Sequence, residues 1–121
     1  MKKILYNVKE NSPLISKEKQ LLGLCSDLGI AAVKLGAADM MKPLSALLTE
    51  GTSSEASESM AECLIFSGFE GDSLDVFLAR YRERNIPVIP LKAVVTPYNI
   101  NWTLGALLLE LDKEHKEMSK R

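Results

Sequence analysis

The sequence predicts a small α/β domain in which a four-stranded, mostly parallel sheet lies between two layers of helices. Short apolar runs alternate along the chain with segments whose apolar residues recur at helical spacing, giving the order βαβαβαβα. The apolar runs contain few polar residues, as expected of strands buried on both faces. The length of 121 residues, with 46% hydrophobic and 26% charged residues, fits a single globular domain covering residues 1–121.

The first three elements are predicted within residues 4–35. Residues 4–8, Ile-Leu-Tyr-Asn-Val, form an apolar run and are predicted as a strand. Over 16–28, apolar residues recur at helical spacing while lysine and glutamate lie between them, which predicts an amphipathic helix. Gly29 is predicted to end this helix, because glycine readily adopts the left-handed conformation of a helix end. A second strand is predicted over 30–35.

The middle of the chain is predicted as a short helix followed by a loop. Pro43 lies at the first turn of the helix over 43–48, where its missing N–H costs little. The stretch near 51–60 is rich in Gly, Ser, Thr and Glu and has no apolar period. A flexible loop is therefore predicted there, and it is too short to separate two domains.

The second half of the chain supplies two more strands and two more helices. They are predicted as strands over 63–66 and 88–95 and as helices over 72–85 and 104–111. Asp72 and Asn101 are suited to cap the two helices, since a short polar side chain accepts from free N–H groups of the first turn. After Asp112 the chain is charged, and this C-terminal tail is predicted to fray.

Two arrangements of these elements are compatible with the pattern. A doubly wound domain with strand order 2-1-3-4 follows if right-handed crossovers join parallel neighbours. The segments that begin at Ile4 and Leu64 are also alike, each with a strand, a turn, a helix and an Ile-led strand. Two such units can form a ferredoxin-like α+β sandwich, with residues 37–61 as an insert and the last helix as an addition.

Charge and composition exclude several classes of function. A formal net charge of −1 argues against nucleic-acid binding, which requires a basic face. No apolar run approaches the roughly 20 residues that cross a bilayer, so no membrane association is predicted. Cys25 and Cys63 are isolated among apolar neighbours and are predicted to be buried structural thiols, which indicates a cytoplasmic protein.

The predicted site lies where parallel strands end, because ligands of open α/β sheets bind beyond the carboxyl ends of the strands. Asn7 follows the first strand, Ser67 the third and Thr96 the fourth. Lys92 is the single charge within the apolar fourth strand, where it either extends to a sheet edge or faces an acidic group. The last helix is predicted to begin at the same edge, where its N–H groups can receive an anion.

Several of these residues also have a purely structural interpretation. Asn99 and Asn101 are typical of turns and helix caps, and Thr96 before Pro97 is restricted to extended geometry. Trp102 in the first turn of a helix is more often a cover for the core than a stacking platform. His115 is predicted to be exposed in a charged segment, and no phosphate-binding glycine fingerprint follows the first strand, so no cofactor and no metal is predicted.

One resemblance to a family is specific. Leu-Lys-Ala-Val-Val-Thr-Pro at 91–97, the Asn-Ile-Asn-Trp at 99–102 and the Leu-rich helix to His115 resemble a bacterial family catalogued as domain of unknown function number 3783. Ile-Phe-Ser-Gly-Phe at 65–69 fits the same pattern, so the resemblance covers about 62–115. It implies a small cytoplasmic bacterial domain, implies no activity, and gives weight to Lys92 and to the polar residues at 96–102.

Three hypotheses of function follow. The first is a non-catalytic module that binds a ligand or a partner, such as a small anionic ligand, through polar residues at the end of the sheet. The ligand-binding residues would be Ser67, Lys92, Thr96, Asn99, Asn101 and Trp102. The second is a small enzyme or enzyme subunit, in which Lys92 is the one plausible ionisable group. The third is a dimerisation or interaction domain that uses the helix over 104–111.

Overall fold

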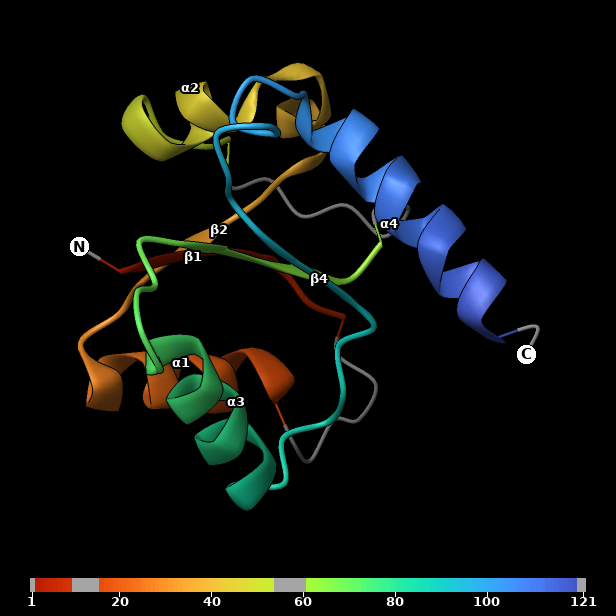
Figure 1. Cartoon of the computed structure of the whole chain (residues 1–121). Coiled ribbons are helices and arrows are strands. Elements are labelled where there is room, and N and C mark those ends of the chain that lie inside the picture. Colours follow the sequence, from red (N-terminus) through yellow and green to blue (C-terminus); the bar gives the residue numbers. More distant parts are fainter. Residues whose placement is uncertain (1, 10–15, 54–60, 120–121) are drawn as a thin grey trace.

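The structure, a computed structural model, describes residues 2–9, 16–53 and 61–119. Its elements are β1 (Lys3–Asn7), α1 (Lys17–Leu28), β2 (Ala31–Lys34), the 3-10 helix η1 (Ala37–Met41), α2 (Leu44–Thr49), β3 (Cys63–Ser67), α3 (Ser73–Glu83), β4 (Leu91–Val94) and α4 (Leu104–Ser119). Helices α1 and α3 cover one face of the sheet, and α2 and α4 lie on the other side (Figure 1). The predicted three-layer α/β domain is thereby confirmed.

The sheet has the strand order β2-β1-β3-β4, as the doubly wound arrangement predicts. Two pairings, β1 with β2 and β3 with β4, are parallel, and a single helix, α1 or α3, connects each pair. The central pairing of β1 with β3 is antiparallel. The sheet is therefore mixed, because the chain between β2 and β3 passes through η1 and α2 and returns in the opposite direction.

The core consists of two apolar clusters, one on each face of the sheet. Toward α1 and α3 the sheet presents Ile4, Leu64 and Phe66, and toward α2 and α4 it presents alternate residues such as Leu5 and Ile65. This alternation is the two-residue period of a strand, so each strand contributes to both clusters. Every fully buried leucine or phenylalanine stabilises the fold by about 1.5–3 kcal/mol relative to its exposed state.

The ends of α1 agree with those expected from the sequence, whereas the residue that caps α4 is not the one expected. The Ser16 hydroxyl accepts from the Lys19 N–H at the start of α1, and Gly29 ends that helix in the left-handed conformation, with φ of 69°. At α4 the cap is Thr103, whose hydroxyl accepts from the Ala106 N–H. The prediction that Asn101 caps this helix is wrong, because the helix begins only at Leu104 and Asn101 lies in the preceding turn.

Helix α4 also extends beyond the predicted residue 111, to Ser119, and an ion pair between Asp112 and Lys116 spans one of its additional turns. Fraying at the end of the chain stays a prediction, since residues 120–121 lie outside the described part. The same holds for most of the predicted loop near 51–60, because residues 54–60 are not described. In the described ranges no helix is long and apolar enough to cross a membrane.

Both cysteines are buried and unpaired, as the sequence predicts. Cys25 packs in the cluster beneath α1 and α3, and Cys63 packs in the cluster beneath α4. Burial raises the pKa of the Cys25 thiol to about 11 and that of the Cys63 thiol to about 12. Each therefore stays a neutral, unreactive thiol near neutral pH.

Candidate functional site

The antiparallel centre of the sheet divides the predicted site between two opposite ends. Asn7, at the carboxyl end of β1, lies opposite Cys63 at the start of β3, whereas Ser67 lies opposite Lys3. The expectation that Asn7 and Ser67 share one edge is therefore wrong. The Asn7 side chain is buried, and its amide donates to the Ala61 carbonyl at 2.9 Å.

The turn after β4 is held together by its own polar side chains. The Asn99 side-chain oxygen accepts from the Thr96 N–H at 2.8 Å, and its amide nitrogen donates to the Val94 carbonyl at 3.0 Å. The Thr96 hydroxyl in turn accepts from the N–H groups of Tyr98 and Asn99. Both ends of the Asn99 amide thus have partners, which is the turn-forming role that asparagine often has.

The other predicted residues do not line the two hollows between α3 and β4 that Lys92 lines. Asn101 and Trp102 are exposed in the turn before α4, where the Trp102 carbonyl accepts from the Leu44 N–H. Ser67 is partly exposed at the end of β3. Ligand binding by Ser67, Lys92, Thr96, Asn99, Asn101 and Trp102 stays a prediction.

Lys92 lies on β4, which is the outermost strand of the sheet on that side. It is paired in register with Leu64, so its side chain is on the face covered by α3. Its neighbours Leu91 and Ala93 pack on the opposite face, against α4. Because α3 does not cover the edge of the sheet completely, the Lys92 side chain is exposed.

Two connected hollows lie between α3 and β4. One, of about 220 Å³, is lined by Leu78, Tyr81, Arg82, Val88 and Lys92. The other, also of about 220 Å³, is lined by Phe66, Leu74, Leu78, Lys92, Ala93 and Val94. Since Leu78 and Lys92 line both, we treat the two hollows as one feature, the α3–β4 groove. Its walls are mainly apolar, and Val88 and Val94 are exposed there.

The charges at the groove are both positive and both unpaired among the described residues. Arg80 and Arg84, the neighbouring arginines of α3, are paired with Glu83 and Asp27. No carboxylate within the described ranges pairs with Arg82 or Lys92. No acidic residue lines either hollow. The α3–β4 groove thus combines apolar walls with two free cations, a combination suited to an apolar partner that carries negative charge.

Tyr81 forms part of the rigid wall of the groove. Its ring is buried, and its hydroxyl donates to the Pro87 carbonyl, which joins the end of α3 to the segment that leads into β4. Burial raises the pKa of the Tyr81 phenol to about 12, with a smaller contribution from Glu62. The hydroxyl therefore stays protonated and keeps donating at any physiological pH.

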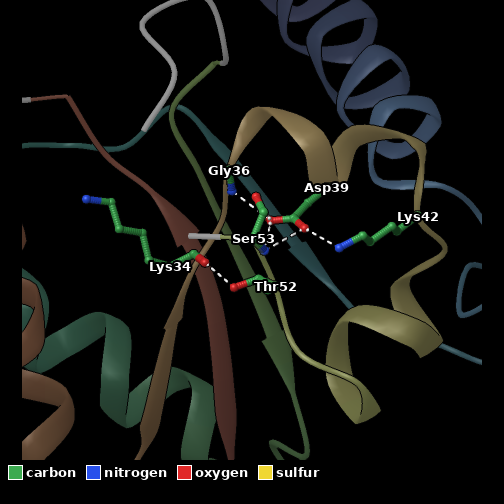
Figure 2. A network of polar contacts seen from close by, with 6 residues as sticks. All are labelled: Lys34, Gly36, Asp39, Lys42, Thr52 and Ser53. Carbon is green, nitrogen blue, oxygen red and sulfur yellow. Dashed lines mark hydrogen bonds and ion pairs between the residues drawn. The ribbon is translucent and has the colours of Figure 1, made fainter. Parts of the chain in front are cut away.

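The sequence analysis missed a buried carboxylate, Asp39, in η1. Its side chain is 0% exposed and accepts from the Gly36 N–H at 2.8 Å, the Ser53 N–H at 2.9 Å and the Lys42 ammonium at 3.1 Å (Figure 2). The Ser53 hydroxyl donates to it as well, at 3.2 Å. Burial by itself would raise the pKa of this carboxyl, but these hydrogen bonds and the Lys42 charge hold it below its usual value.

Asp39 anchors the chain after α2 to the end of β2. Next to the aspartate, the Thr52 hydroxyl donates to the Lys34 carbonyl at 2.6 Å, while the Lys34 side chain extends away from the network (Figure 2). The donors to Asp39 come from three separate segments, at Gly36, Lys42 and Ser53, so the network ties these segments together. The sequence signal was a charge between small and apolar residues, Ala-Ala-Asp-Met-Met at 37–41.

A second buried charge, Lys17, lies at the end of the sheet where Asn7 is found. Its ammonium contacts the Glu62 carboxylate at 2.6 Å, and the same carboxylate oxygen accepts from the Lys9 N–H at 2.7 Å. Lys17 begins α1 and Glu62 precedes β3, so the pair joins two elements that are distant in sequence. It was not predicted, because the lysines between the apolar positions of an amphipathic helix are expected to face the solvent.

Neither of these networks resembles a metal centre. His115, the one histidine of the chain, is exposed on α4, as predicted. Among residues 2–9, 16–53 and 61–119, no group of three His, Cys, Asp or Glu side chains is placed to hold a metal ion.

The fold and this groove define a small α/β domain with an open edge strand. Residues 62–118 match the family described as a domain of unknown function, DUF3783. This match agrees with the resemblance at 62–115 that the sequence showed. The match contains β3, α3, β4 and nearly all of α4, and therefore every residue of the groove. Comparisons with curated proteins and with solved structures give no match.

Proposed function

We propose that this domain is a non-catalytic partner-binding module and that the α3–β4 groove is its binding surface. The observation that carries the proposal is the coincidence in one place of an apolar groove, an edge strand and two cations that have no ion-pair partner in the described part of the chain. Exposed apolar surface flanked by polar groups is typical of interaction sites. A cytoplasmic location belongs to the same proposal, in line with two cysteines that are not joined in a disulfide.

The exposure of Lys92 favours binding over catalysis. A lysine that acts as a nucleophile or base is usually desolvated in a pocket, which lowers its pKa and frees the amine. Lys92 is instead exposed and stands at the rim of an open groove. An exposed lysine in this position can attract and orient an anionic group of a partner, which requires no proton transfer.

The groove, which Lys92 lines, and the turn after β4 are alternative locations for the binding site. In the groove, the partner contacts α3 through residues such as Leu78 and Arg82. In the turn, a small polar ligand contacts Ser67, Thr96 or Asn101 instead. A map of the residues that respond to a bound molecule separates the two locations.

The test begins with peptides selected from a random library displayed against the folded full chain. Their binding sites are mapped by changes in backbone amide NMR shifts, and affinities are measured by calorimetry. We expect the shifts to concentrate at Leu78, Arg82 and Lys92. A map centred on Ser67 and Asn101, or no selected peptide at all, contradicts the proposal.

A matched pair of substitutions then tests the groove itself. Val88 lines the groove and is 75% exposed, whereas Leu109 on α4 lies outside it and is 72% exposed. Because both side chains are largely in water, Val88→Asp and Leu109→Asp are expected to fold alike. We expect Val88→Asp to weaken peptide binding about tenfold, by placing a like-charged, polar group where an acidic apolar partner packs, and Leu109→Asp to leave it unchanged. Equal effects of the two variants count against the groove.

A further inference from the structure

We propose that the partner enters the α3–β4 groove as an extended peptide, pairs with β4 as a fifth strand and places an acidic side chain between Lys92 and Arg82. The inference rests on the proposed function and names the form and chemistry of the partner. Three observations support it: free peptide groups on the outer edge of β4, an apolar stripe of α3 beside that edge, and the sign of the two unpaired charges.

The outer edge of β4 has backbone groups without a hydrogen-bond partner among residues 2–9, 16–53 and 61–119. The Val95 N–H donates to the Phe66 carbonyl at 2.8 Å, so the peptide groups of Val95 face β3. Peptide groups alternate in direction along a strand, and those of Lys92 and Val94 therefore face away from the sheet. Consistent with this, the Val94 carbonyl is the acceptor of the Asn99 side chain. The N–H and carbonyl of Lys92 and the N–H of Val94 remain for an added strand.

Helix α3 provides a wall for one face of such a strand. Leu74, Leu78 and Arg82 are spaced four residues apart and line the groove along the helix. Lys92 and Val94 have their side chains on the same side of the sheet. A strand added about 4.8 Å from β4 would direct every second side chain toward this wall. Apolar side chains would meet Leu74 and Leu78, and a carboxylate would meet Arg82.

Charge complementarity selects an acidic peptide rather than a second copy of this chain. If the β4 strands of two copies paired, the interface would bring together Lys92 and Arg82 of both copies. These like charges would repel one another. An acidic side chain in the same place has two cationic partners. A lysine on an edge strand also discourages self-pairing, and this accounts for Lys92 but not for the hollow beside Arg82.

The experiment uses the full chain and two series of eight-residue peptides with capped ends. In both series every second position faces α3 and carries valine or isoleucine, except one that is glutamate in the first series and lysine in its counterpart; the remaining positions are serine. We expect the glutamate series to bind about tenfold more tightly, with an advantage that shrinks at high salt. Equal binding by the two series overturns the acidic preference.

Amide hydrogen exchange tests strand pairing separately from binding. In the bound state we expect the amides of Lys92 and Val94 to gain at least about tenfold protection, since both would become donors to the peptide. The amide of Ala93, which already faces β3, should change little. Binding in the groove without protection of Lys92 and Val94 overturns the fifth strand but leaves the proposed function intact. Failure of every peptide to bind the groove overturns both.

Reversing the charges at Lys92 and Arg82 tests where the acidic side chain of the peptide lies. The double variant with Lys92→Glu and Arg82→Glu changes two exposed side chains, so the fold should persist, and Lys113→Glu on α4 is the control. We expect the double variant to prefer the lysine series over the glutamate series by about tenfold and the control to behave as wild type. An unchanged preference in the double variant contradicts the placement of the acid. Protection of Lys92 and Val94 without peptide, together with dimers in sedimentation, assigns the edge to a second copy instead.

Discussion

Asp39 and Lys92 are both single charges in apolar stretches of sequence, yet the structure treats them in opposite ways. Asp39 is 0% exposed and is held by hydrogen bonds from Gly36, Ser53 and Lys42, all within the chain. Lys92 is exposed on an edge strand beside a groove and has no ion-pair partner among the described residues. The difference shows that a charge is available to a partner only where the fold leaves it unsatisfied.

The largest loss of stability is expected on substitution of Asp39. Asp39→Asn removes the negative charge and turns one acceptor into a donor that faces donors, so buried N–H groups lose their partner. We expect the free energy of unfolding to fall by about 3 kcal/mol, because the substitution disrupts a buried charged network. Urea unfolding measures this. The control Asp75→Asn, in the exposed first turn of α3, should cost no more than about 0.5 kcal/mol through the helix dipole. A loss at Asp39 as small as that of the control contradicts the structural role.

Acidification probes the same carboxylate in the wild-type protein. The pKa of Asp39 is lowered in the folded state, so its contribution is fully present above the unfolded pKa of about 3.9 and is lost as the pH falls through the folded pKa. We expect wild type to lose more stability than Asp39→Asn from about pH 4 downward. Parallel stability curves for the two proteins across this range would show that Asp39 titrates alike in the folded and unfolded states.

A smaller effect is expected at the hydroxyl of Ser53. Ser53→Ala removes the donor 3.2 Å from the Asp39 carboxylate but retains the backbone N–H at 2.9 Å. We expect a loss of about 1.5 kcal/mol in the free energy of unfolding, the lower end of the contribution of one hydrogen bond to a charged group. Differential scanning calorimetry of Ser53→Ala and Asp39→Asn measures both. A loss as large as that of Asp39→Asn would mean that the Ser53 hydroxyl, and not the backbone, holds the aspartate.

Much of the fold could be predicted from the sequence because it depends on periodicity. Strands and helices with a regular apolar spacing, such as α1 and α3, follow from the contacts each residue must make with a core. The direction of β3 relative to β1 does not follow from spacing. It is set by the path of residues 35–62, which contain the short helices η1 and α2 and can enter the sheet from either end. The antiparallel centre, and with it the separation of Asn7 from Ser67, was therefore not predictable.

From the sequence, individual residues of the candidate site could be predicted, but not the groove that Lys92 lines. Lys92 was noticed because a charge inside an apolar strand requires an explanation. The groove beside it depends on α3 lying next to β4, which is a tertiary contact between elements. Asp39 was missed because its partner Ser53 is fourteen residues away and follows no period. The cap of α4 was predicted two residues too early, at Asn101, since the sequence does not show whether it or Thr103 precedes the helix.

The smallest effect on stability is expected on substitution of Lys92, the exposed charge. Lys92→Met keeps the aliphatic part of the side chain over the groove and removes a charge that no described carboxylate balances. We therefore expect the melting temperature to stay unchanged. Binding of the glutamate peptides should weaken about fivefold, because one of the two cationic partners of the acid is lost. Calorimetry and a binding titration on the same preparation give both values. A lower melting temperature would show that the Lys92 ammonium stabilises the fold itself, and unchanged affinity would remove it from the binding surface.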